Sequence, residues 1–295
     1  MTGGRTGRAA GRLTLACAAA LLLAAPGPAR ADEARTLWTP HGMAWLFLPP
    51  AAGPGPHPVV LVLADRPGAD GRETPYLDYL LQAGIAVLKL MVDEPDAAMT
   101  LLTPPWLRRI ARDIAPGRLD GTRIGLLGFG GGGRAALAAP PGLPAAALYP
   151  ACAGLAPRHH TGPTLLLHPD DPAETAACRH VTPGAEPLRG ATHGWDHGHG
   201  PWEDGTALLP HPDGSATRLF SRSDGRATQA AVARVVRHFA AAFGSTASVP
   251  GQPHAGDHAG RFPSGAEMDA IRSDVPPSDA GLPDEAAPAA YREDH

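Results

Sequence analysis

The residues of this sequence that could do chemistry are centred on a turn whose expected reactive residue is missing. A short apolar run, 124–127, is typical of a buried strand, and the glycines from Gly128 to Gly133 lead into an alanine-rich segment that can begin a helix. Strand, sharp turn and helix form the context of a nucleophile elbow, G-x-S-x-G. The serine position of that motif holds Gly130 here, and the first serine of the whole chain is Ser215. The sequence therefore predicts the scaffold for a nucleophile without its reacting atom.

Two later segments carry the groups that assist such a nucleophile. An apolar run, 163–167, leads into Asp170 and Asp171, and His193 lies in a glycine-containing segment before the last predicted helix. In a catalytic triad the carboxylate fixes the tautomer of the imidazole, and the imidazole takes a proton from the nucleophile. Nucleophile, acid and histidine in this chain order is one of the orders in which triads occur.

Strands that alternate with helices must position these groups. We expect strands over 36–40, 43–48, 59–63, 85–91, 124–127, 145–149, 163–167 and, weakly, 185–192. We expect helices over 73–83, 104–115, 172–180 and 226–243. Apolar residues at helical spacing support 73–83, 104–115 and 226–243. This alternation predicts an α/β fold with a mostly parallel sheet that helices cover on both faces.

Both ends of the chain differ from this pattern. Arg5, Arg8 and Arg12 precede an apolar run, 13–25, and a small-residue site ends at Ala31. This is the layout of a secretory signal peptide, and the run is short for a membrane anchor, which needs about 20 apolar residues. Residues 244–295 are acidic, rich in Pro, Gly and Ala, and lack periodicity, which is typical of disorder. We therefore predict a signal peptide (1–31), an α/β domain (32–243) and a disordered tail (244–295), in a protein that is exported and has no stable membrane anchor.

Charge and cysteine content narrow the classes of partner. The net charge is -4, and no basic block occurs outside the N-terminus, so we expect no nucleic-acid binding. The predicted mature chain keeps Cys152 and Cys178. In an oxidising compartment two cysteines favour one disulfide, and metal binding or nucleophilic use of either is the alternative.

Taken together, these segments resemble the dienelactone hydrolase family of α/β-hydrolases. The resemblance spans about 38–243 and is carried by the following segments: 120–129 with the glycines after it, Tyr149-Pro-Ala-Cys152, 163–168 with Asp171, Cys178, and Gly190-Ala-Thr-His193-Gly-Trp-Asp196. It implies the α/β-hydrolase fold and hydrolysis of a small ester or lactone. It also implies His193 as general base and Asp171, or else Asp170, as the orienting acid.

The resemblance has two further implications for single residues. Tyr149-Pro-Ala-Cys152 with the later Cys178 is similar to a cysteine pair in related exported proteins, which supports a Cys152–Cys178 disulfide. The family has serine or cysteine where this chain has Gly130.

The loop after the predicted strand 59–63 departs from the family pattern as well. Members often have His-Gly and a small residue there, whereas this chain has Ala64-Asp65-Arg66-Pro67-Gly68. That loop normally supplies one N–H of the oxyanion hole, and the residue after the nucleophile supplies the other. Arg66 and Gly131 are therefore the candidate oxyanion-hole residues, and a charged, proline-containing loop alters the hole.

We therefore expect an ester or lactone hydrolase scaffold whose acyl-enzyme chemistry is impaired, with a small ester, lactone or carboxylate as its partner. The main competing interpretation is a non-catalytic protein that binds a carboxylate at the elbow beside His193, because N–H groups at a helix N-terminus favour anions. The sequence also leaves open hydrolysis by Cys152 or by a water that His193 activates, and a purely structural exported protein without a pocket.

Two further motifs suggest cofactors that we do not expect. Residues 128–133 satisfy G-x-G-x-x-G, the dinucleotide fingerprint, but the next predicted strand ends at Tyr149 and Pro150 without the required acid. The segment 193–204 holds His193, His197 and His199 with nearby acids and could bind zinc or copper. Its interleaved glycines favour a polar loop instead. We predict no cofactor and no metal.

Overall fold

The computed structural model describes residues 35–39, 42–49, 55–65, 71–91, 109, 112, 115–139, 141–157, 162–198 and 205–244. The predicted signal peptide, the predicted tail beyond Gly244, Arg66 and His199 lie outside these ranges. Most of the predicted helix 104–115 also lies outside them, although Arg109 and Arg112 are helical. The three-part division of the chain therefore stays a prediction.

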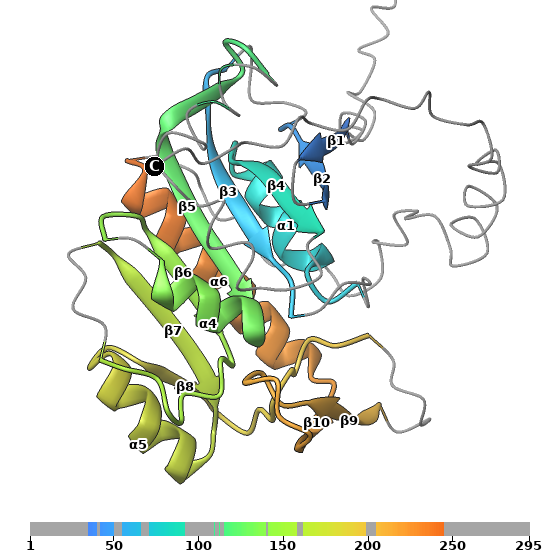
Figure 1. Cartoon of the computed structure of the whole chain (residues 1–295), viewed down its shortest axis with the longest axis vertical. Helices are drawn as coiled ribbons and strands as arrows, with labels where there is room; N and C mark the ends of the chain where they lie inside the picture. The colour runs from blue at the N-terminus through green and yellow to red at the C-terminus, as the bar shows by residue number, and fades with distance from the viewer. Residues whose placement is uncertain are drawn as a thin grey trace, which may run out of the picture. The chain divides into compact units, whose positions relative to one another are not determined.

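The centre of the fold is an eight-stranded, mostly parallel sheet with the order β1-β2-β4-β3-β5-β6-β7-β8. Figure 1 shows this sheet running through the described part of the chain. The strands β1 and β2 pair with each other, and β2 with β4, in antiparallel fashion, and the remaining pairs are parallel. This arrangement is an α/β fold with a mostly parallel sheet, as predicted. The strands are β1 Arg35–Thr39, β2 Gly42–Phe47, β3 His57–Leu63, β4 Ala86–Met91, β5 Leu119–Phe129, β6 Ala145–Leu148, β7 Thr164–Pro169 and β8 Glu186–Leu188.

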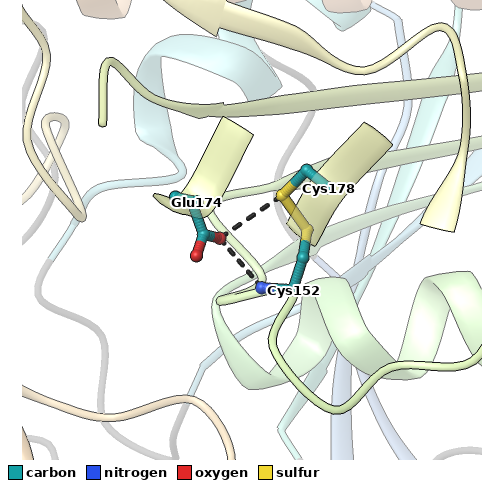
Figure 2. Close-up of side chains that lie close together, drawn as sticks. All are labelled: Cys152, Glu174 and Cys178. Carbon is teal, nitrogen blue, oxygen red and sulfur yellow. Dashed lines mark hydrogen bonds between the residues drawn. A yellow bond between two sulfur atoms is a disulfide. The ribbon is translucent and has the colours of Figure 1, made fainter. Parts of the chain in front are cut away.

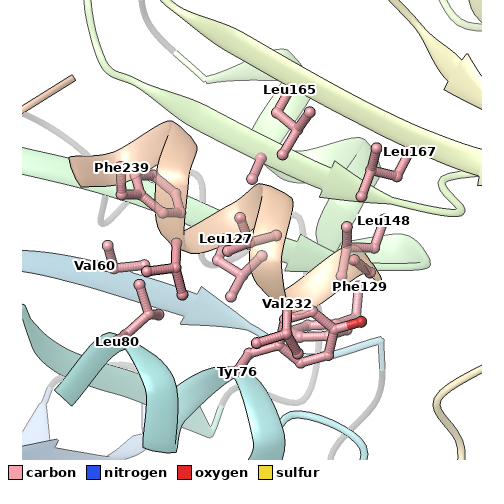
Figure 3. Close-up of a cluster of buried hydrophobic side chains, with 14 of the residues drawn as sticks. Val60, Tyr76, Leu80, Leu127, Phe129, Leu148, Leu165, Leu167, Val232 and Phe239 are labelled. Carbon is pink, nitrogen blue, oxygen red and sulfur yellow. The ribbon is translucent and has the colours of Figure 1, made fainter. Parts of the chain in front are cut away.

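Helices cover both faces of the sheet because the central strands are apolar on both sides. Val60 and Val62 of β3 pack in one cluster with α1 (Thr74–Gln82) and α6 (Gly225–Ala242), as Figure 3 shows for Val60. Leu61 of β3 belongs to a second cluster on the opposite face, with α4 (Gly131–Ala138). The helix α5 (Pro172–Val181) packs on that opposite face through a third cluster. A continuous apolar strand buried on both faces is the pattern expected of a parallel sheet.

Two helices begin at side chains that cap them. Asp171 accepts a hydrogen bond from the Glu174 N–H at the start of α5 (2.8 Å). Asp224 accepts hydrogen bonds from the N–H groups of Arg226 (2.9 Å) and Ala227 (3.0 Å) at the start of α6. Such caps satisfy N–H groups that have no partner inside the helix. Asp171, which was predicted as the triad acid, therefore caps the N-terminus of α5.

A two-stranded ribbon, β9 (Thr206–Pro210) and β10 (Arg218–Arg222), follows the main sheet and is absent from the expected elements. Leu208 and Phe220 pair directly across it and are 52% and 55% exposed. A ribbon with exposed apolar residues lacks the alternation of buried and polar positions that predicts a strand. The last sheet strand, β8, is also shorter than the expected 185–192. Among the described residues, no helix has both the length and the apolar character needed to cross a membrane.

Candidate functional site

The predicted elbow is present as a strand, a tight turn and a helix. Gly130 lies between β5 and α4 with φ +50° and ψ −115°. Residues other than glycine rarely adopt such a backbone conformation with positive φ. Its N–H donates to the carbonyl of Leu148 (3.0 Å), and its own carbonyl accepts from the Arg134 N–H (3.1 Å). The turn therefore holds position 130 at the carboxyl end of β5, where a nucleophile would be exposed to substrate.

The side chain of Asp65 fills the space that a side chain at position 130 would need. A Cβ atom built on Gly130 would lie no more than 2.7 Å from the carboxyl carbon and both carboxyl oxygens of Asp65. The N–H of Gly131 donates to Asp65 Oδ1 at 2.6 Å. This is the N–H that we predicted for the oxyanion hole. The carboxylate of Asp65 therefore fills the space of the nucleophile and also accepts the hydrogen bond of the N–H beside it.

Asp65 reaches this place because of the strand order. β3 lies next to β5, and Leu63 pairs with Gly128, so that Asp65, two residues after Leu63, comes beside Gly130. Asp65 Oδ2 lies 3.9 Å from Arg72 Nη1, and the two side chains are only 11% and 10% exposed. Asp65 belongs to the altered loop, and the sequence indicates no role for it, whereas Arg66, the candidate oxyanion-hole residue of that loop, lies outside the described residues.

His193 is buried beside this pair, as a neutral imidazole. It is 6% exposed, and its ring packs edge-on against Tyr149 at 5.1 Å between centroids. Burial, together with the positive charge of Arg72 nearby, lowers the pKa of His193 to about 3. Within the described part of the chain, Nε2 of His193 has no hydrogen-bond partner.

The two candidate acids bind backbone groups and not His193. Asp170 accepts from the Gly190 N–H (2.9 Å), and Asp171 caps α5. No hydrogen bond joins either carboxylate to His193 among the described residues. The roles of His193 as base and of Asp171 or Asp170 as orienting acid therefore stay predictions, and no part of the arrangement separates the two aspartates.

Asp196 is a buried residue of the histidine segment, and the sequence alone indicates no role for it. It accepts hydrogen bonds from the hydroxyls of Tyr76 (2.7 Å) and Tyr149 (2.6 Å). Burial raises the pKa of Asp196 to about 6, although Arg72 and the two hydroxyls favour its charged form. The buried hydroxyl of Ser221 donates a hydrogen bond to the Gly194 carbonyl (3.2 Å) and so ties the histidine segment to β10. These bonds fix the position of His193.

The neutral state of His193 predicts a stability that falls at acid pH. The pKa of a histidine in the unfolded chain is about 6.5, and the folded value is about 3, so below about pH 6.5 the unfolded chain binds a proton that the folded protein does not. The contribution is complete above about pH 6.5 and is lost as the pH falls towards about 3. From about pH 7 to about pH 5, wild type should lose about 2 kcal/mol more unfolding free energy than His193→Gln. Urea unfolding at both pH values measures this, and equal losses would contradict the neutral assignment.

A cavity of about 390 Å³ lies beside His193. Its wall comes from the segments that follow β6 and β7, from the start of α5, from the histidine segment and from the ribbon strand β10. Asp171 and His193 both line it, together with Glu174, Leu219 and Phe220. The parallel sheet brings these segments together, because the carboxyl ends of its strands share one edge.

The predicted disulfide joins the helix α5 to the segment after β6, as Figure 2 shows. Cys152 and Cys178 are bonded, with their Cα atoms 5.0 Å apart, so neither sulfur is a free nucleophile or a thiolate ligand. These two cysteines and Glu174 are the one group of metal-ligating side chains that comes together in the described residues. The described histidines of the segment 193–204 do not form such a group, and His199 lies outside the described ranges.

Loss of the disulfide should destabilise the protein. The bond closes a loop with a sequence separation of 26, and a loop of that size restricts the unfolded chain enough to contribute about 3 kcal/mol. Cys152→Ala/Cys178→Ala should therefore unfold at lower urea concentration than wild type. Wild type in reductant should match the variant in its urea midpoint. A midpoint that neither change moves would contradict this prediction.

Comparison with known proteins gives matches among solved structures, all at low identity. No protein-family model matches the sequence, and no curated protein matches it. Among solved structures, a dienelactone hydrolase from Anabaena variabilis has a TM-score of 0.47 at 17% identity, over 72% of this chain and 97% of its own. A ferulic acid esterase from Streptomyces cinnamoneus has a TM-score of 0.46 at 16% identity, over 69% and 72% of the two chains.

A third solved structure, a dienelactone hydrolase-like promiscuous phosphotriesterase from metagenomic libraries, has a TM-score of 0.44 at 19% identity. The similarity covers 72% of this chain and 99% of that one. At such identities the likeness concerns the fold and assigns no activity to this chain.

Proposed function

We propose that this protein binds a small organic molecule on an ester-hydrolase scaffold and does not form an acyl-enzyme at position 130. The observation that supports the proposal is the carboxylate of Asp65, which lies in the space of the missing nucleophile and takes the Gly131 N–H. Glycine has no atom with which to attack a carbonyl carbon, and an anion at this N–H competes with the oxyanion that the hole would stabilise.

The neighbouring side chains support the same proposal. Cys152 is in a disulfide and Ser221 is buried with its hydroxyl on the Gly194 carbonyl, so neither offers an obvious replacement nucleophile. An external carboxylate cannot use the Gly131 N–H while Asp65 holds it. We therefore place the ligand in the cavity beside His193 and not at the elbow.

One observation favours a second candidate function, which is hydrolysis by a water molecule that His193 activates. A neutral imidazole with an unpartnered nitrogen can take a proton from water, and His193 has such a nitrogen. This route needs no nucleophile at position 130. It predicts turnover of an ester that depends on His193.

Hydrolysis of an activated ester separates the two functions. The full chain and His193→Ala are each mixed with p-nitrophenyl acetate, and the release of p-nitrophenol is followed at steady state. Binding without catalysis predicts that both proteins remain at the rate of buffer alone. A rate that is well above buffer and is lost in His193→Ala would replace the proposal with the water route.

We also propose that the protein works outside the cytoplasm. The N-terminal sequence pattern and the disulfide support this placement, because disulfides persist in oxidising compartments. Mass analysis of the protein from an exporting host should give a chain that begins at Asp32. A cytoplasmic chain that retains residues 1–31 would contradict the placement.

A further inference from the structure

One wall of the cavity beside His193 is acidic. The exposed Asp170 and Asp171, at the end of β7, and the half-buried Glu174, in the first turn of α5, all line it. The described residues that line the cavity include no lysine or arginine. Three carboxylates that share a cavity repel one another, so a positively charged occupant would lower their energy.

The three carboxylates are held in place by backbone N–H groups. Asp170 accepts from Gly190 (2.9 Å), Asp171 from Glu174 (2.8 Å), and Glu174 Oε1 from Cys152 (2.8 Å). Figure 2 shows Glu174 against the disulfide, with its second oxygen directed away from it. Each carboxylate thus keeps a second oxygen without a hydrogen-bond partner among the described residues, and a ligand that donates hydrogen bonds could use these oxygens.

The lining of the cavity also includes an imidazole and apolar groups. His193 is 6% exposed, and Nε2 has no partner among the described residues. A buried nitrogen of this kind normally finds a partner in water or a ligand. Leu219 and Phe220 of β10 supply apolar surface, and Phe220 is 55% exposed.

The acidic wall does not fit a single metal ion. A metal requires ligand atoms that converge, and in the described part of the chain the group that converges is Cys152, Glu174 and Cys178, whose sulfurs are in the disulfide. The carboxylates of Asp170 and Asp171 and the imidazole of His193 are spread around the cavity. A cation that is larger than a metal ion and donates several hydrogen bonds fits this spacing better.

We propose that the cavity binds a small organic ammonium ion that carries an apolar group. The inference rests on the proposed binding function and adds the chemical class of the ligand. The ammonium group donates hydrogen bonds to the free oxygens of the acidic wall, and the apolar group lies against Leu219 and Phe220. An anionic carboxylate of the same size is repelled by the same wall.

Three probes of nearly equal shape test the charge of the ligand. Phenethylamine is cationic at neutral pH, phenethyl alcohol is neutral, and phenylpropanoate is anionic. Calorimetric titration of the full chain should give an affinity for phenethylamine about tenfold above that for the alcohol. Phenylpropanoate should bind more weakly than both, and added salt should reduce the preference for the amine.

Isosteric variants locate the effect on the acidic wall. Glu174→Gln and Asp171→Asn keep an oxygen for the N–H groups of Cys152 and Glu174, so both should fold. Each should lower the affinity for phenethylamine about fivefold and leave that for phenethyl alcohol unchanged. Glu186→Gln is the matched control, because Glu186 pairs with Arg234 outside the cavity, and it should change neither affinity.

The possible outcomes separate this inference from the proposed function. If the three probes bind equally, or the anion binds best, the ammonium inference is wrong while the binding function stands. If Glu174→Gln and Asp171→Asn both behave like Glu186→Gln, the inference is again wrong. If no probe binds and an ester is turned over with His193, the proposed function is wrong as well.

Discussion

Gly130→Ser is expected to destabilise the protein by about 4 kcal/mol and not to create an esterase. One part of this loss comes from the positive φ of Gly130, which a serine adopts at a cost of about 1–3 kcal/mol. The other part comes from the overlap of the new Cβ with the carboxyl group of Asp65, within 2.7 Å. The free energy of unfolding in urea measures the total.

Two further proteins divide the effect into its parts. Gly154 has φ +77° and open space where a Cβ would lie, so Gly154→Ser should show the backbone cost alone. Gly130→Ser on an Asp65→Ala background should cost about as little as Gly154→Ser, because the overlapping carboxyl group is gone. If Gly130→Ser alone is as stable as wild type, Asp65 does not occupy this space.

Asp65→Ala is expected to lower stability by about 4 kcal/mol, and acetate should restore part of the loss. The substitution removes one side of a nearly buried ion pair with Arg72, which costs about 3–5 kcal/mol, and it exposes the Gly131 N–H at the start of α4. A small carboxylate can then bind there, because N–H groups at a helix N-terminus attract anions. Thermal unfolding with and without sodium acetate, against sodium chloride of equal ionic strength, measures the recovery.

Two control variants test whether the response to acetate depends on the loss of the Asp65 carboxylate. Asp120→Ala removes a carboxylate that pairs with Arg123 (2.7 Å) and accepts from the N–H and hydroxyl of Thr122, at the opposite end of β5 from Gly131, and should show no response to acetate. Asp65→Asn keeps an oxygen for the Gly131 N–H and should show no acetate response either. If acetate stabilises wild type, Asp65→Ala and Asp65→Asn equally, the carboxylate of Asp65 does not hold the anion site.

The sheet was predictable because its strands carry their own signal. The apolar run of β3 and the run before Gly128 are buried on both faces, and such runs indicate a parallel sheet whatever lies around them. The elbow glycines were recognisable for a similar reason, since strand, turn and helix lie next to one another in the sequence. The ribbon of β9 and β10 was missed because Leu208 and Phe220 are apolar and yet exposed.

The role of Asp65 could not be predicted from its own segment. Its position depends on the pairing of Leu63 with Gly128 between two strands that are far apart in the sequence. With that register known, a residue two positions after Leu63 is expected beside Gly130. The hydrogen bonds of Asp196 with Tyr76 and Tyr149 likewise join three distant segments, so the sequence identified the histidine segment but not what holds it in place.

We expect no acyl-enzyme in this domain, because Gly130 has no attacking atom and the carboxylate of Asp65 fills the elbow. Rapid mixing of the full chain with p-nitrophenyl acetate, followed by an acid quench and mass analysis of the protein and its peptides, tests this expectation. No burst of p-nitrophenol and no acetyl group on any side chain of the domain should be found, for wild type and for His193→Ala alike. A burst that matches the protein concentration, with one side chain acetylated in wild type and not in His193→Ala, would contradict it.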